Sequence, residues 1–224
     1  MYYYYYNPIM KKMMDSKRST LKKYTTIPVL FDILARKRIA LLDPKKWEDR
    51  NDWKIMEQYR KKKNKKSILA TCFCYGNESI YHWNAFSKEE DGCMIAFDFG
   101  KFINHVADNY PDVYMGVVQY KYLKELNENF KLDEIPFTKR KQYACEKEFR
   151  FIQLFDEETT SFDIAFDHSF IKKIVLTQKM PTCISETLKK KIAAFGIPAK
   201  KIEVSSILEN KKWVDFFENF RDSE

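Results

Sequence analysis

The sequence is poor in the residues that build metal centres, disulfide frameworks and interdomain linkers. It has five cysteines, an odd number, and no two of them are spaced as C-x-x-C. Its three histidines, His82, His105 and His168, are too scattered to form a ligand cluster. No stretch rich in proline, glycine or serine separates two halves, and there are no internal repeats. We therefore predict one domain without a metal site.

Long apolar runs are also missing. No run reaches the ~20 residues of a membrane-spanning helix, and the N-terminus lacks the apolar core of a signal peptide. The cysteines have mostly apolar neighbours, as expected for reduced thiols inside a cytoplasmic protein. Residues 1–20 open with five tyrosines, Tyr2 to Tyr6, and we expect an N-terminal tail or an added strand there, followed by a single domain over residues 21–224.

What the sequence has in abundance is apolar side chains and positive charge. Hydrophobic residues make up 45% of the 224 residues, which is sufficient for a folded core. Lysine and arginine number 40 against 32 acidic residues, giving a net charge of +8. A basic chain suits a polyanionic partner such as nucleic acid, or a ligand that carries phosphate.

The segment around Glu148 carries the most chemistry. From Lys147 the residues alternate as in a half-buried strand, with Phe149 and Phe151 on one side and Glu148 and Arg150 on the other. Glu146, two residues before Glu148, is expected on the same face. Like charges favour an abnormal pKa in one carboxyl group, and Arg150 can hold the other ionised. The alternative is a solvated strand face with a cross-strand ion pair.

Hydrophobic periodicity predicts an α+β fold in which strands alternate with helices. Strands are expected at 21–26, 39–42, 68–74, 93–97, 114–120, 147–152, 164–166, 171–176 and 202–204. Helices are expected from Pro28 for about two turns and at 53–63, 98–109, 122–129, 181–194 and 213–220, and a short helix or a turn is expected at 81–87. The result is one mixed or split sheet with flanking helices.

Several blocks in this order carry a family resemblance. They are K-K-Y-T-T-I-P-V-L at residues 22–30, L-D-P at 42–44, G-C-M-I-A-F-D at 92–98 and E-K-E-F-R at 146–150. Residues 21–180 thereby resemble the bacterial family called domain of unknown function 2971, whose name implies no activity.

The same order of blocks is similar to the ADP-ribosyltransferase superfamily, whose split-sheet fold binds NAD in a cleft. That resemblance implies a first-strand residue at Lys23 or Tyr24, a second at Phe86 or Ser87, and a glutamate at Glu146 or Glu148. It also implies NAD as substrate and a nucleic acid or protein as acceptor, in an intracellular toxin or defence effector.

The implied roles follow the chemistry of glycosyl transfer. Glu148 would stabilise the oxocarbenium-like centre and Glu146 would orient the acceptor. Arg150 or Lys23 would hold the diphosphate or the carboxylate geometry. Tyr24, Trp83 and Phe86 would then share a pocket with Glu148, whereas the ordinary role of Trp83 and Trp47 is core packing.

Two other classes of function compete with this one. Basic runs at 61–66, 139–141 and 189–191 suit a non-catalytic module that binds nucleic acid. A metal-dependent nuclease would use carboxylates from Asp43, Asp49, Asp52, Glu146 and Glu148, although no spaced metal motif is present.

Overall fold

A mixed β-sheet in two halves forms the centre of the molecule. The computed structural model describes residues 4–5, 8–16, 19–87 and 90–220. One half of the sheet has the order β1–β6–β9–β4 and the other the order β2–β5–β11–β12. The strands of the first half are β1 (Tyr4–Tyr5), β6 (Tyr114–Val117), β9 (Glu148–Phe155) and β4 (Ser67–Cys74). Those of the second half are β2 (Thr20–Thr26), β5 (Gly92–Asp98), β11 (Ile171–Leu176) and β12 (Ile202–Val204).

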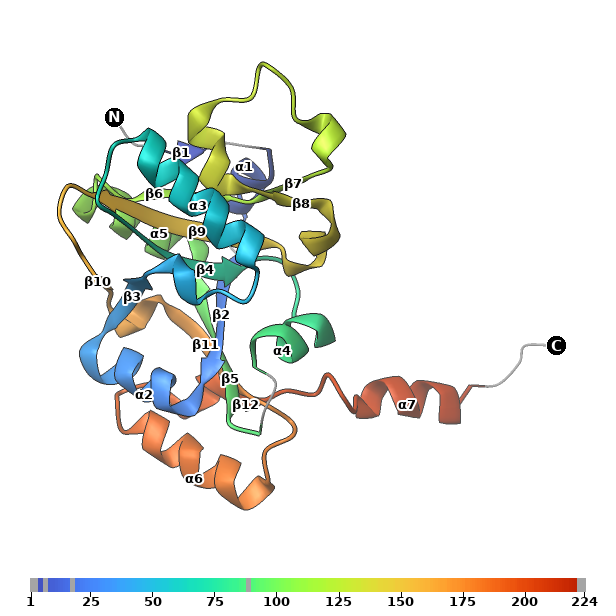
Figure 1. Cartoon of the computed structure of the whole chain (residues 1–224). Coiled ribbons are helices and arrows are strands. Elements are labelled where there is room, and N and C mark those ends of the chain that lie inside the picture. The colour runs from blue at the N-terminus through green and yellow to red at the C-terminus, as the bar shows by residue number, and fades with distance from the viewer. Residues whose placement is uncertain (1–3, 6–7, 17–18, 88–89, 221–224) are drawn as a thin grey trace.

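The remaining strands lie outside this path. The antiparallel pair β3 (Arg38–Leu42) and β10 (Ser161–Ala165) joins the sheet where Leu42 of β3 meets Ala70 of β4. The parallel pair β7 (Gln119–Lys121) and β8 (Thr138–Arg140) forms a separate small sheet. Figure 1 shows these strands and helices in one body, which confirms the predicted single α+β domain with a mixed, split sheet.

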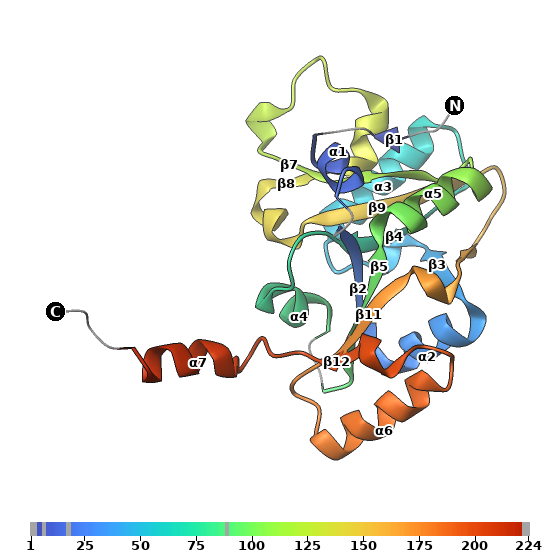
Figure 2. The same ribbon diagram turned by 180° about the vertical axis from the view of Figure 1, so that it is seen from behind.

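Helices cover both faces of the sheet. They are α1 (Pro8–Met14), α2 (Ile27–Arg36), α3 (Arg50–Lys62), α4 (Ile80–Phe86), α5 (Phe99–Asn109) and α6 (Thr182–Ala193), whereas α7 (Lys211–Glu218) projects away from the sheet. α3 lies in front of β9 and β4 in Figure 1, and α5 lies in front of the same strands in the reverse view of Figure 2. Among the described residues, no helix is long and apolar enough to cross a membrane.

Local sequence explains where the first long helix begins and ends. Thr26 has extended backbone angles, Pro28 occupies the first turn, and Lys37 ends α2 in the left-handed region with φ 50°. Leu30, Ile33 and Leu34 are buried, as their spacing predicts. The connection from β2 to α2 therefore forms as expected from the sequence.

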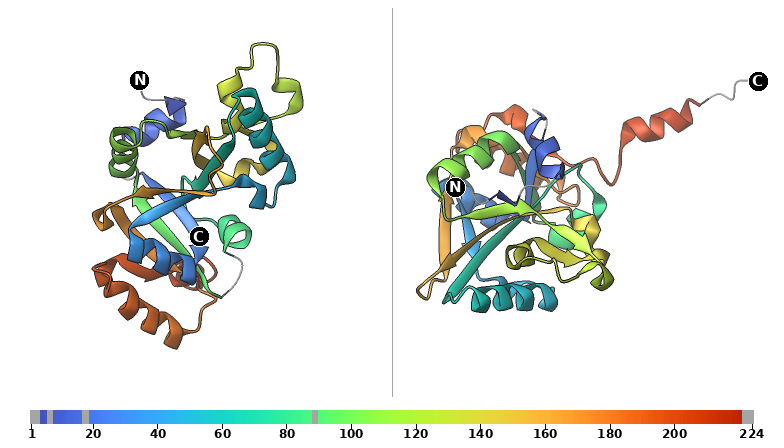
Figure 3. Two further views of the ribbon diagram at one scale, coloured as in Figure 1. Left: turned by 60° about the vertical axis from the view of Figure 1, so that its left-hand side comes forward. Right: turned by 90° about the horizontal axis from the view of Figure 1, so that it is seen from above.

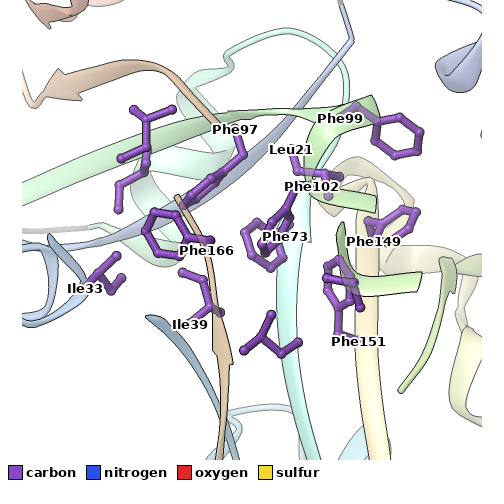
Figure 4. Packing of buried hydrophobic residues seen from close by; sticks show 14 of the residues in the cluster. Leu21, Ile33, Ile39, Phe73, Phe97, Phe99, Phe102, Phe149, Phe151 and Phe166 are labelled. Carbon is purple, nitrogen blue, oxygen red and sulfur yellow. The ribbon is translucent and has the colours of Figure 1, made fainter. Parts of the chain in front are cut away.

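The main core is an aromatic cluster on one face of the sheet (Figure 4). Phe73 packs against Phe97, Phe102 and Phe151 with ring centroids 5.9, 5.7 and 5.4 Å away. All four rings are buried, and burial of each side chain contributes about 1.5–3 kcal/mol. This face of β9 is therefore held by ordinary hydrophobic packing.

Four sequence expectations need correction or narrowing. Residues 122–129 were expected to be helical but contain only the 3-10 helix η2 (Leu123–Glu125), since Leu123 and Leu126 are exposed and give a helix no face to bury. The expected strand 114–120 is divided between β6 and β7. Cys145 and Cys183 are exposed rather than packed in the core. Ile184 lies at a spacing of four residues from Leu188, and Leu188 from Ile192, which predicts an apolar face on α6, but Ile184 is also exposed.

The N-terminal segment forms an added strand and a helix where it is described. β1 pairs in parallel with β6, and Met10 and Met13 of α1 are buried in the main core. Residues 1–3, 6–7 and 17–18, which include Tyr2, Tyr3 and Tyr6, lie outside the described residues. Of the two alternatives for this segment, a tail and an added strand, the described residues form the second.

Candidate functional site

A cavity of about 820 Å³ opens where the two halves of the sheet separate. β2 and β4 are paired at one position only, Lys22 opposite Cys74. Beyond that pair the strands diverge, because β4 pairs with β3 at Ala70 instead. The walls of the cavity come from β2, β3, β4, α4 and the segment around Trp47, and Glu148 is among the lining residues.

The side chain of Lys23 spans the gap between β2 and β4 where these strands diverge. Its Nζ donates hydrogen bonds to Thr71 Oγ1 at 2.8 Å and to the carbonyl oxygen of Cys72 at 3.0 Å. The ammonium group therefore satisfies a β4 carbonyl that faces the gap. Burial lowers the pKa of Lys23, so this cation is held in an environment that disfavours its charge.

An ionic cluster lies beneath the cavity, on the face of β9 opposite the aromatic core. Arg150, with none of its surface exposed, donates from Nε to Glu148 Oε2 at 2.8 Å and from Nη1 to Asp52 Oδ1 at 3.0 Å. Its Nη2 also donates to Asp52 Oδ2. Lys139 Nζ donates to Glu148 Oε1 at 2.7 Å and to Glu146 Oε2, and it lies 3.4 Å from Asp52 Oδ2. Two cations and three carboxyl groups thus share one buried site.

The pKa values of the two glutamates in this cluster are shifted in opposite directions. Burial raises the pKa of Glu146 to about 8, assisted by the hydrogen bond and the negative charge of Glu148. Burial alone would raise the pKa of Glu148 too, but Arg150, the hydrogen bond with Glu146 and Lys139 hold that pKa well below its usual range. With a proton on Glu146, two cations face two carboxylates, and the buried cluster is balanced.

This arrangement corrects two expectations about the E-x-E-x-R segment. The segment is not a solvated strand face, because Glu146, Glu148 and Arg150 are all buried. Glu146 does not share a strand with Glu148, since it ends the 3-10 helix η4 (Lys141–Glu146) and Lys147 turns the chain with φ 47°. The two carboxyl groups meet because Lys139 binds both of them.

His82, which no sequence pattern singled out, holds the turn that presents Glu146. Its Nε2 lies 3.0 Å from the carbonyl oxygens of both Cys145 and Glu146, and its Nδ1 lies 2.9 Å from Ser79 Oγ. Carbonyl oxygens only accept, so Nε2 carries the proton and Nδ1 accepts from the Ser79 hydroxyl. Burial lowers the pKa of His82, which favours this neutral form.

The other residues predicted for the site divide between the cavity and its support. Tyr24 and Phe86 line the cavity together with Lys23, Glu146 and Glu148.

Trp83, Ser87 and Arg150 are not among the described residues that line the cavity. Trp83 packs edge-on against Tyr24 at 5.2 Å and donates from Nε1 to Glu78 at 2.7 Å. The Ser87 hydroxyl donates to the carbonyl oxygen of Thr25 at 2.7 Å, which ties α4 to β2. Trp83 and Ser87 therefore support the walls of the cavity without lining it.

Two aromatic rings close the ionic cluster on the cavity side. The Arg150 guanidinium lies 5.0 Å from the ring centre of Trp47, and Lys139 Nζ lies 4.6 Å from that of Tyr143. Both rings line the cavity. Stacking on the π faces stabilises the cations and excludes water from them.

Two of the three basic runs proposed as a nucleic-acid surface, 61–66 and 139–141, are partly engaged within the protein. Lys63 pairs with Asp133 at 2.6 Å and Lys65 with Asp156 at 2.8 Å. Lys139 is buried in the ionic cluster. The continuous surface expected from residues 61–66 and 139–141 is therefore reduced.

The carboxylates proposed for a nuclease are likewise bound to protein cations. Asp52, Glu146 and Glu148 contact Lys139 or Arg150, which occupy the place a metal ion would take. Over the described part of the chain, no group of three or more His, Cys, Asp and Glu side chains is arranged to hold a metal ion.

Asp52 and Lys139 are the members of the cluster that the E-x-E-x-R pattern could not supply. Asp52 appeared only among the carboxylates of a nuclease, and Lys139 only within a basic run. Asp52 of α3 contacts Arg150, and Lys139 of β8 contacts Glu148, so both contacts are made between separate elements. No spacing rule links residues so far apart in the sequence.

Comparison with known proteins gives distant structural likenesses only. DarT of Thermus sp. 2.9 in complex with NAD+ is 11% identical, over 83% of this chain and 94% of that chain, with a TM-score of 0.40. The same protein in complex with ADP-ribosylated ssDNA is 13% identical, over 87% and 95% of the two chains, with a TM-score of 0.39. In complex with carba-NAD+ the values are 12%, 87%, 96% and 0.39.

No protein-family model and no curated protein matches the sequence. Membership of the family called domain of unknown function 2971 therefore stays a prediction.

Proposed function

We propose that the protein binds NAD in the cavity and transfers its ADP-ribosyl group to an acceptor on nucleic acid or protein. The observation that carries this proposal is the pair of carboxyl groups, Glu146 and Glu148, which line the cavity and are bridged by Lys139. Their surroundings raise the pKa of Glu146 and lower that of Glu148. Environments that push two pKa values apart assign an acid–base role to one group and an electrostatic role to the other.

Glu148 is the residue suited to the electrostatic role. Breaking the bond between the ribose carbon and the nicotinamide nitrogen leaves positive charge on the sugar as nicotinamide departs with the bonding electrons. Both carboxylate oxygens of Glu148 are fixed, one by Lys139 and one by Arg150. A carboxylate whose orientation is fixed in advance stabilises such a charge without reorganising during the reaction.

Glu146 is the residue suited to proton transfer. The acceptor must lose a proton as it attacks the sugar carbon, and a carboxyl group with a pKa near the working pH can receive it. Glu146 is protonated below about pH 8 and can accept a proton only above it. Transfer should therefore become faster as the pH rises through that value.

The cavity itself suits a nucleotide. Its volume of about 820 Å³ lies within the usual range of ligand pockets. Tyr24, Trp47 and Phe86 offer ring faces for stacking, and Lys23 offers a cation for a phosphate or carboxylate.

The decisive substitution is Glu148→Gln, which removes the charge and keeps the shape. Loss of several kcal/mol of transition-state stabilisation should reduce NAD turnover by on the order of a hundredfold or more. NAD affinity should change little, because Glu148 is assigned to the sugar centre and not to the diphosphate. Turnover is measured with RNA, DNA or protein as acceptor, at matched thermal stability.

A suitable control is Glu186→Gln, the same chemical change at an exposed position on α6. Equal turnover by wild type and Glu148→Gln, or no NAD binding by the wild type at about millimolar concentration, would contradict the proposal. Salt-sensitive nucleic-acid binding without NAD turnover, unchanged in Glu148→Gln, would instead favour the non-catalytic binding module.

A further inference from the structure

Glu148 is held by the small sheet that lies outside the main one. Its strands β7 and β8 pair in parallel, with Tyr120 opposite Lys139. Both side chains reach the glutamate. Lys139 Nζ donates to Glu148 Oε1 at 2.7 Å, and the Tyr120 hydroxyl accepts from the backbone N–H of Glu148 at 2.8 Å. The small sheet therefore binds Glu148 by its carboxylate and by its backbone.

The small sheet meets the main sheet at this point. Both of its strands lie next to the start of β9 in Figures 1 and 2. The yellow-green connection between them, residues 122–137, projects outward from the body in Figure 3. Neither strand belongs to the main ten-stranded sheet. The place of Glu148 relative to Lys139 therefore depends on contacts between two separate sheets.

The turn before Glu148 explains why its N–H needs a partner from a side chain. Lys147 has the left-handed angles φ 47° and ψ 54°, which a non-glycine residue adopts only where its surroundings hold it. The Lys147 carbonyl oxygen accepts from the Tyr75 N–H at 2.9 Å, and the Glu148 carbonyl oxygen accepts from the Val118 N–H at 2.9 Å. Tyr120 satisfies the N–H of Glu148, which would otherwise be a costly unpaired donor in a buried residue.

The two glutamates are held from opposite sides of this turn. His82 of α4 contacts the carbonyl oxygens of Cys145 and Glu146, and Tyr120 contacts the N–H of Glu148. The hydrogen bond and the negative charge of Glu148 help to raise the pKa of Glu146, so the separation of the two carboxyl groups controls that pKa. A contact that fixes Glu148 therefore also acts on Glu146.

We propose that Tyr120 is a positioning residue, which fixes the carboxyl group of Glu148 against that of Glu146 through the backbone N–H of Glu148. Tyr120 is not among the described residues that line the cavity, so it acts through the glutamates. Burial and the negative charge of Glu148 raise the pKa of Tyr120, and its neutral hydroxyl accepts the N–H without adding a charge to the cluster. The effect on catalysis rests on the proposed function, whereas the effect on the two carboxyl groups does not.

The first test examines the carboxyl groups without any substrate. Tyr120→Phe removes the accepting oxygen and keeps the ring. The amide of Glu148 should exchange with solvent at least about tenfold faster. In carbon-13 NMR the Glu146 carboxyl group should titrate about one pH unit or more below the wild-type value of about 8.

The matched control is Tyr110→Phe, which removes a phenol oxygen that accepts from the N–H of Ala165 at 2.8 Å. A Glu146 titration that is the same in Tyr120→Phe, the control and the wild type would overturn the proposal. If Tyr120→Phe does not fold, replacement of Tyr120 by fluorotyrosine keeps the ring and the hydroxyl but weakens the oxygen as an acceptor. The shift should then have the same direction and be smaller, and its absence would overturn the proposal.

A second test separates this role from the proposed function. Above pH 8, where Glu146 is ionised, Tyr120→Phe should lower kcat for NAD turnover about tenfold, because a misplaced carboxylate stabilises the transition state less well. KM for NAD should stay within about twofold, and the pH dependence of kcat should move to lower pH together with the Glu146 titration. An unmoved pH dependence, or an equal loss in Tyr110→Phe, would overturn the proposal. A wild type that titrates as expected but does not turn over NAD would contradict the proposed function alone.

Discussion

Strand β9 has two buried faces of opposite character. Phe149 and Phe151 lie on one face within the aromatic core, whereas Glu148 and Arg150 lie on the other face within the ionic cluster. Burial of the rings is favourable in itself. Burial of ions is favourable only when each charge is paired, and removing one partner is costly. One face of β9 is buried by apolar packing, whereas the other buries charged groups beneath a cavity. Buried charges at a cavity indicate a candidate functional site.

The largest expected effect is on the free energy of unfolding, and its dependence on pH should differ between the two faces of β9. Arg150→Met should reduce the free energy of unfolding by about 3–5 kcal/mol at pH 7, because Asp52 and Glu148 lose their buried partner. This loss of stability should be smaller at low pH, because protonation neutralises the carboxylates that no longer have Arg150 as a partner. Phe151→Ala should lose a similar 3–5 kcal/mol without that pH dependence. Urea unfolding of both variants at pH 4.5 and 7 measures the difference.

Equal losses at both pH values for Arg150→Met would mean that the cluster contributes packing rather than charge. That result would remove the distinction between the faces.

A smaller effect is expected for Glu146→Gln on the pH dependence of stability. The pKa of Glu146 is raised from 4.5 to about 8 in the folded protein. Between these values the unfolded chain has lost a proton that the folded chain retains, so the wild type loses stability as the pH rises. Glutamine mimics the protonated form, so the variant should lack this decline, which amounts to about 1.4 kcal/mol for each pH unit between the two pKa values. Urea midpoints from pH 5 to 8.5, compared with Glu186→Gln, provide the measurement.

The smallest effect is expected for Lys23→Met. Loss of two hydrogen bonds is offset by removing a charge in a site that lowers its pKa, so stability should change by less than about 1 kcal/mol. If Lys23 binds the anionic part of NAD, affinity should fall by roughly tenfold. Isothermal titration compares it with Lys61→Met, an exposed position on α3. The same loss of affinity in both variants would indicate only a long-range effect of net charge.

The sequence was informative about the apolar face of β9 and about the order of strands and helices. Alternation predicted that Phe149 and Phe151 lie together, and periodicity predicted the buried side of α2. Both depend on local spacing, which burial selects directly. The helix expected at residues 122–129 failed because Leu123 and Leu126 find no surface to cover.

The ionic face could be predicted only in part. The sequence predicts that one of Glu146 and Glu148 has an abnormal pKa and that Arg150 holds the other ionised. The shared strand face on which that prediction rests holds for Glu148 and Arg150 but not for Glu146. The contributions of Asp52 and Lys139 required the packing of α3 and β8, and the turn at Lys147 required knowledge of its left-handed backbone. The sequence alone therefore identified Glu148 and Arg150 but not Asp52 and Lys139, which complete the ionic cluster.

The central claim is that the ionic face holds one protonated and one ionised glutamate at neutral pH. Carbon-13 NMR of protein labelled at the glutamate carboxyl carbon tests it directly, with Glu146→Gln and Glu148→Gln to assign the two signals. We expect the Glu146 signal to titrate near pH 8 and the Glu148 signal to remain that of a carboxylate down to acidic pH. Two signals that both titrate near the ordinary glutamate value of about 4.3 would contradict the account.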